Sequence, residues 1–116
     1  MPQYVLMFVG SDEWREKSSK EEVARGYAAV GGWWNELSQK GVIKSGTELA
    51  HGRDAATTVR RVNGQMKVID GPFIESKEHV GGFAMIEVPD RDAAIAVAES
   101  WPGGDVEVRP IVVRER

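Results

Sequence analysis

The sequence contains no cysteine, which excludes disulfide bonds, thiolate metal sites and a cysteine nucleophile together. It also lacks long apolar runs. Residues 4–9 form an apolar stretch far shorter than a signal-peptide core, and no segment approaches the roughly 20 apolar residues needed to cross a bilayer. We therefore expect a cytoplasmic protein with no membrane partner.

Charge of one sign is also scarce. Fifteen basic and eighteen acidic residues leave a net charge of −3, and the longest basic cluster, Arg60-Arg61, is too short to follow a phosphate backbone. Direct nucleic-acid binding is therefore not expected. Only two histidines are present, His51 and His79, and the sequence has no HExxH-type pair. Hence we expect neither a metal nor another cofactor.

Hydrophobic periodicity predicts a single domain over residues 1–116, without repeats or linkers. Ser19 and Glu22 have the spacing of a helix capping box, and Asn63-Gly64 is a strong hairpin turn. Residues 11–18 are expected to be a loop or a short helical turn. The predicted strands are residues 3–9, 42–51, 82–88 and 106–113, the helices 19–40 and 91–100, and the hairpin strands 57–62 and 65–69.

Without its hairpin, this order is βαββαβ, the ferredoxin-like α+β arrangement, in which both helices cover one face of an antiparallel sheet. Residues 4–9 and 83–86 are apolar at consecutive positions, whereas a sheet with one solvated face should alternate. We therefore expect both faces to be covered. A second copy of the sheet is the simplest cover and predicts a homodimer. The alternative is that the inserted hairpin folds over that face.

The densest polar segment is residues 70–79. Gly71 and Pro72 predict a tight bend that holds Asp70 at a strand end, and Phe73 is expected to anchor the segment in the core. Asp70 and Glu75 are candidate acid–base residues. The alternative is a turn aspartate followed by a solvated charged loop.

Both histidines and one arginine extend this candidate site. His51, at a predicted strand end, and His79, at the end of the polar segment, could assist proton transfer, although His51 could equally be a polar strand terminus. Arg60 could steady an anionic group or form an ion pair with Asp70 or Glu75.

The segment DGPFIESKE, followed by Gly81-Gly82-Phe83, closely resembles the signature of the DGPF (DGPFAETKE) family within the YCII-related superfamily. The resemblance runs nearly end to end, with Ile74 and Ser76 in place of the usual alanine and threonine. It implies a ferredoxin-like dimeric α+β barrel. The residues that match the signature are Asp70, Gly71, Pro72, Phe73, Glu75, Lys77 and Glu78.

The resemblance implies two hypotheses about function. Some superfamily relatives are lactone-processing dehalogenases, which suggests an acid–base lyase or hydrolase acting on a small polar, lactone-like metabolite. A histidine–aspartate site has been proposed in others, but the predicted helix 19–40 contains no histidine. Members also occur beside or fused to extracytoplasmic-function sigma factors, which suggests a non-catalytic ligand sensor. In either case the expected ligand contacts are Gly71, Pro72, Phe73, Lys77, Glu78 and Arg60. A signature that serves folding alone is the third alternative.

Overall fold

The computed structural model describes residues 1–73 and 78–114. Its centre is a four-stranded antiparallel sheet with the strand order β2-β5-β1-β6. This order and the βαββαβ connectivity confirm the predicted ferredoxin-like α+β fold. The strands are β1 (Gln3–Gly10), β2 (Ile43–Glu48), β5 (His79–Glu87) and β6 (Asp105–Pro110).

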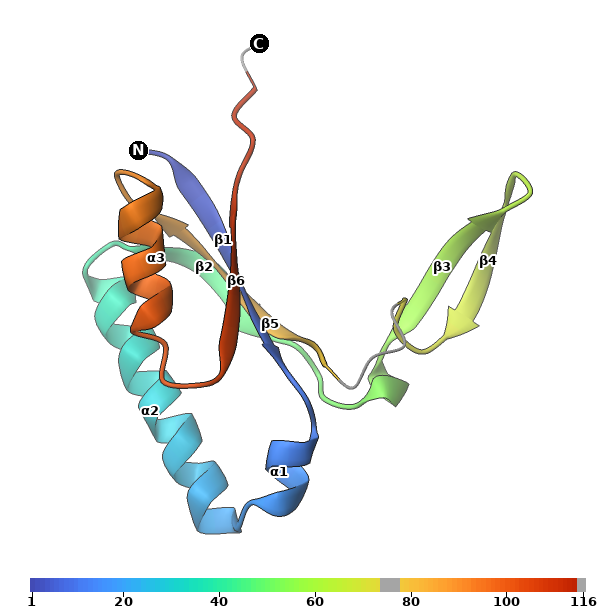
Figure 1. Ribbon diagram of the computed structural model, residues 1–116, viewed down its shortest axis with the longest axis horizontal. Coiled ribbons are helices and arrows are strands. Elements are labelled where there is room, and N and C mark those ends of the chain that lie inside the picture. Colours follow the sequence, from blue (N-terminus) through green and yellow to red (C-terminus); the bar gives the residue numbers. More distant parts are fainter. Residues whose placement is uncertain (74–77, 115–116) are drawn as a thin grey trace.

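Two helices, α2 (Lys20–Gln39) and α3 (Arg91–Glu99), lie on the same face of the sheet (Figure 1). The predicted capping box is present: the Ser19 side chain accepts from the Glu22 backbone N–H, and the Glu22 carboxylate accepts from the Ser19 N–H. Asp90 caps α3 in a similar way through the Ala93 N–H. The segment predicted as loop or helical turn contains the short helix α1 (Glu13–Lys17).

The core lies between the sheet and these two helices. Burial alternates along β1 and β5, so that every second side chain points at the helices. Phe8 stacks on Trp101 with ring centroids 4.0 Å apart, and Trp33 meets both rings edge-on. The buried hydrophobic residues are Tyr4, Leu6, Phe8, Ile43, Ala84, Ile86, Val88 and Ala94.

The other face of the sheet is only half-buried within one chain. Val5 pairs with Met85 and Met7 with Phe83, and these four side chains all point away from the helices. The consecutive apolar residues of the central strands therefore separate into a buried set and a half-buried set. The sequence predicted a cover for both faces, but in the described part of a single chain the helices cover one.

The inserted hairpin forms its own two-stranded sheet of β3 (Thr57–Val62) and β4 (Gln65–Asp70). Asn63 and Gly64 both have positive φ, 51° and 79°, as the predicted turn requires. The hairpin extends away from the four-stranded sheet, on the side opposite α2 and α3 (Figure 1). The alternative in which it folds over the open face of its own sheet is therefore not what the structure adopts.

Three strand boundaries differ from the sequence prediction by three residues, and the others by one residue at most. β2 ends at Glu48 rather than near His51, and the chain continues into a short 3-10 helix, η1 (Arg53–Ala55). β5 begins at His79 rather than Gly82, because His79 pairs with the last residue of β1, Gly10. β6 ends at Pro110 rather than at Val113, although the Ile111 N–H still donates to the Gln3 carbonyl at 2.9 Å.

Candidate functional site

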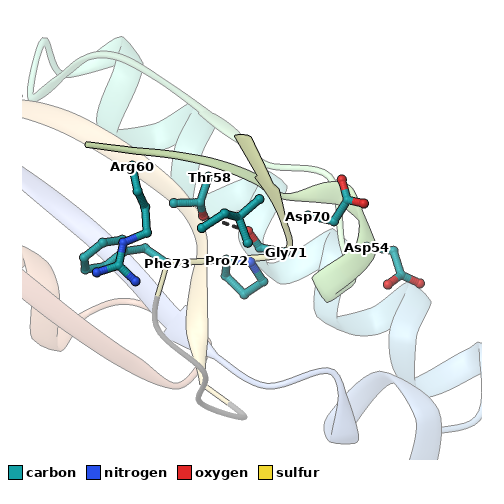
Figure 2. Close-up of a pocket in the computed structure, with 8 residues that line it drawn as sticks. Asp54, Thr58, Arg60, Asp70, Gly71, Pro72 and Phe73 are labelled. Carbon is teal, nitrogen blue, oxygen red and sulfur yellow. Dashed lines mark hydrogen bonds between the residues drawn. The ribbon is translucent and has the colours of Figure 1, made fainter. Parts of the chain in front are cut away.

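A groove of about 560 Å³ lies at the base of the hairpin. Side chains from η1, β3, β4 and the bend after β4 line it (Figure 2). Four of the signature residues and the predicted anion-binding arginine are among them. The lining residues are Asp54, Thr58, Arg60, Ile69, Asp70, Gly71, Pro72 and Phe73.

The bend that shapes this groove is held by backbone geometry. Gly71 has φ +99°, a conformation that L side chains rarely adopt, so glycine is favoured there. Its N–H donates to the Ala56 carbonyl at 2.9 Å, and its carbonyl accepts from the Thr58 hydroxyl at 2.7 Å. Asp70, the last residue of β4, pairs with Thr57. The predicted fixed bend is confirmed, and its contacts are with Ala56, just before β3, and Thr58, within β3.

The two ends of the groove differ in charge. Asp70 and Asp54 lie at one end, whereas Arg60 and Phe73 lie at the other (Figure 2). The Arg60 guanidinium sits over the Phe73 ring, 4.9 Å from its centroid, a cation–π contact. Phe73 is 67% exposed, so the prediction that it anchors the segment in the core was wrong. The hairpin base leaves this ring outside the helix–sheet core.

The remaining signature residues follow the groove in sequence. Glu75 and Lys77 lie outside the described residues. Glu78 is exposed and directly precedes β5. Consequently, the predicted pairing of Arg60 with Glu75 stays a prediction.

The two histidines do not line this groove. His79 starts β5, and its Nε2 lies 3.3 Å from Asp12 Oδ1, just before α1. His51 lies in the segment between β2 and η1. The structure thus separates the three described acid–base candidates: Asp70 lines the groove, His79 lies beside Asp12, and His51 belongs to a further polar cluster.

We call Arg15, Tyr27, Glu48 and His51 the His51 cluster. The Tyr27 hydroxyl donates to Glu48 Oε2 at 2.8 Å, and the Arg15 guanidinium donates to the Tyr27 oxygen. His51 Nε2 lies 2.9 Å from Glu48 Oε2, 2.8 Å from Arg15 Nη2 and 3.2 Å from the Tyr27 oxygen. Sequence reasoning missed three of these four residues. The only signal for Tyr27 was its spacing in the predicted helix, four positions after Val23 and three before Val30, which is typical of an apolar stripe and suggested packing.

The charge balance of the His51 cluster is visible at Glu48. Partial burial alone raises the pKa of its carboxyl. Hydrogen bonds from Tyr27 and His51, with the positive charges of His51 and Arg15, more than offset that effect, so the net pKa lies below the ordinary glutamate value. Glu48 is therefore a carboxylate at neutral pH, held by its neighbours.

Within residues 1–73 and 78–114, no three histidine, aspartate or glutamate side chains are grouped so that they could hold a metal ion. None of the helices in the same described ranges is long and apolar enough to span a membrane.

Comparison with known proteins identifies the family. The model of the YCII-related domain matches residues 5–113, almost the whole chain. The chain belongs to the YCII-related family. An uncharacterized protein of Rhizobium meliloti (strain 1021) is 31% identical over 102 residues, which cover 84% of this chain and 79% of the relative. The description of that relative names no activity.

Proposed function

We propose that this YCII-related protein binds a small polar metabolite in the groove at the hairpin base and transfers a proton on it through Asp70. The observation that supports this proposal is the groove itself, whose lining includes Asp70, Arg60 and Phe73. A carboxylate at one end and a cation over an aromatic ring at the other suit a ligand with an ionisable group and a flat or anionic group.

In this proposal each end of the groove has its own task. Asp70 acts as general base or acid, with Asp54 as a second carboxylate at the same end. Arg60 holds an oxyanion of the ligand, since guanidinium donors match carboxylate and enolate oxygens. The reaction class is a lyase or hydrolase step on a lactone-like metabolite. Glu75, Lys77 and Glu78, which follow Phe73 within five positions, are proposed to complete the site.

The test is a screen of lactone and enol substrates with the wild type and Asp70→Asn. We expect a fall in kcat of about 100-fold or more, the usual loss when a general acid or base is removed. Asp92→Asn is the matched control, because it removes an exposed aspartate on α3, away from the groove. Equal activity of the wild type and Asp70→Asn would refute the catalytic proposal.

A second candidate is ligand sensing without turnover, favoured by the exposure of Asp70 and Arg60 to solvent. An open groove excludes water poorly, which suits binding better than many proton transfers. This candidate predicts thermal stabilisation by a ligand with no product formed, and loss of that stabilisation in Arg60→Gln. The association with a sigma factor implied by the resemblance stays a prediction, which co-purification tests.

We further propose that the protein is a homodimer joined through the open face of its sheet. The half-buried apolar centre of that face has a neighbouring edge, β6, that carries both Glu107 and Arg109. An apolar centre with a polar rim of both signs suits a two-fold contact between identical surfaces. The central residues are Val5, Met7, Phe83 and Met85.

Light scattering at micromolar concentration tests this assembly. We expect the mass of two chains for the wild type and of one chain for Met7→Glu, because a charge at the centre of the contact would lose its hydration. Ala29→Glu, on the exposed side of α2, is the matched control and should remain a dimer. A single-chain mass for the wild type would refute the proposal.

A further inference from the structure

The His51 cluster brings together four side chains from four separate segments. Arg15 comes from α1, Tyr27 from α2, Glu48 from the end of β2 and His51 from the following loop. Partners separated by as many as 36 positions meet within hydrogen-bond distance of one another. None of the four lines the hairpin groove, so the cluster is a second, independent polar centre.

The hydrogen-bond donors of the cluster converge on one carboxylate. Tyr27 has a single hydroxyl proton, and the structure directs it at Glu48 Oε2. The hydroxyl oxygen can then accept from Arg15. His51 Nε2, when it carries a hydrogen, points a second donor at the same Glu48 oxygen. The arrangement is a cradle for a carboxylate, with a guanidinium behind the hydroxyl.

The position of His51 limits how many of these contacts can form at once. Arg15 can only donate, so it bonds His51 Nε2 only when that nitrogen is unprotonated. Glu48 accepts from the same nitrogen only when it is protonated. One of the two contacts is therefore always unmade. If another hydrogen-bond acceptor contacted Arg15 directly, Arg15 would no longer need His51 Nε2, and that nitrogen could donate to Glu48.

Glu48 is free to leave the cradle. Its side chain is 53% exposed, and it is the last residue of β2, beyond the helix-covered core. Contacts between side chains exposed to this degree are weak, because water competes for both partners. Rotation of Glu48 into solvent would uncover the Tyr27, His51 and Arg15 donors together.

We infer that the His51 cluster is a binding site for small carboxylates, and that Glu48 occupies it as an internal competitor. A free carboxylate has two oxygens that can bond Arg15 side by side while still accepting from Tyr27 and His51, a geometry that guanidinium groups favour. The ligand class is therefore a small organic acid in its anionic form. Its binding does not depend on the function proposed for the hairpin groove.

The test uses acetate as the probe and acetamide as its neutral counterpart. Binding is followed through the imidazole nitrogen signals of His51 in NMR spectra. We expect Glu48→Ala to bind acetate roughly tenfold more tightly than the wild type, the gain expected if Glu48 fills the cradle about nine-tenths of the time. Acetamide should bind neither protein. The double variant with Glu48→Ala and Arg15→Gln should not bind acetate more tightly than the wild type does.

Two controls separate this inference from simpler explanations. Glu36→Ala removes the same charge from the exposed pair of Glu36 with Lys40 on α2, and it should leave acetate affinity at the wild-type level. Glu48→Gln, which keeps the side-chain volume, should fall between the wild type and Glu48→Ala. Melting temperatures verify that each variant is folded. Unchanged or weaker acetate binding by Glu48→Ala, or an equal gain in Glu36→Ala, would overturn the inference.

Discussion

The four-stranded sheet and the β3–β4 hairpin are built from similar apolar strand residues but differ in what covers them. Leu6 and Ile86, in the centre of the sheet, have no exposed surface. On the hairpin, Val68 is 71% exposed, and Val59 and Met66 are more than half exposed. The sheet has two helices packed on one face, whereas the hairpin extends alone (Figure 1).

Strand propensity and burial are therefore separate properties of a residue. β-branched residues specify an extended backbone in both regions. Burial requires a second layer, and among residues 1–73 and 78–114 the helices α2 and α3 supply one to the four-stranded sheet but not to the hairpin. A two-stranded hairpin without a second layer is marginally stable by itself. The hairpin therefore depends on its attachment at β2 and β5, or on a partner molecule, for its order.

The largest expected effect comes from truncating equivalent side chains in the two regions. Leu6→Ala should lower the free energy of unfolding by about 3 kcal/mol, because it leaves a cavity in the packed core. Val68→Ala should change it by less than about 0.5 kcal/mol, because its side chain already faces water. Urea unfolding curves check both values. A loss above about 1.5 kcal/mol for Val68→Ala would show that the hairpin is buried in an assembly.

A smaller change in the free energy of unfolding should follow from replacing a closely packed glycine or an exposed glycine with alanine. Gly46 has φ +144°, and a Cβ there would meet the Phe83 carbonyl oxygen and lie 2.7 Å from Trp34. Gly46→Ala should therefore lower the free energy of unfolding by about 2–3 kcal/mol. Gly31, exposed on α2 with nothing within 4 Å of a Cβ, is the matched position. Gly31→Ala should raise stability by about 0.5–1 kcal/mol.

Thermal unfolding of the two glycine variants tests whether Gly46→Ala lowers stability and Gly31→Ala raises it. A stabilising Gly46→Ala would mean that β2 is not held against Trp34 as the structure has it. A destabilising Gly31→Ala would mean that this face of α2 is packed against something outside the single chain.

The smallest expected effect is the pH dependence of the His51 cluster. Because the pKa of Glu48 is lowered in the folded protein, its ionisation stabilises the fold above the ordinary glutamate pKa of about 4.3, and that stabilisation is lost as the pH falls through the lower, folded value. Between about pH 5 and pH 3, the wild type should lose a few tenths of a kcal/mol more than Glu48→Gln, since the group is half exposed. Urea unfolding at several pH values gives the free energy of unfolding of both proteins. The prediction would be contradicted if the two free energies fell by the same amount between about pH 5 and pH 3.

Much of the fold was predictable because its signals are local. Ser19 and Glu22 lie three positions apart and mark the start of α2, and Asn63-Gly64 mark the hairpin turn by their tolerance of positive φ. The bend at Gly71 was equally local, so the sequence located part of the groove, with Asp70 on its wall. Residues adjacent in sequence were brought together by backbone rules alone.

The His51 cluster was not predictable in the same way. Tyr27 fits the apolar stripe of α2 by spacing, yet its hydroxyl reaches Glu48, which lies 21 positions later on another element. Nothing in the local sequence distinguishes Arg15 or Glu48 from other charged surface residues. His51 was selected as a candidate for proton transfer, but its partners Arg15, Tyr27 and Glu48 were not.

Most helices, strands and turns of this YCII-related protein follow from local sequence, because those choices depend on residues within one or two turns of each other. The glycine-dependent bend beside Asp70 follows from local sequence as well. Which sheet face the helices cover, where the hairpin extends and which charged groups meet are set by the assembled fold. Those outcomes depend on packing between segments far apart in the chain, which no local pattern encodes.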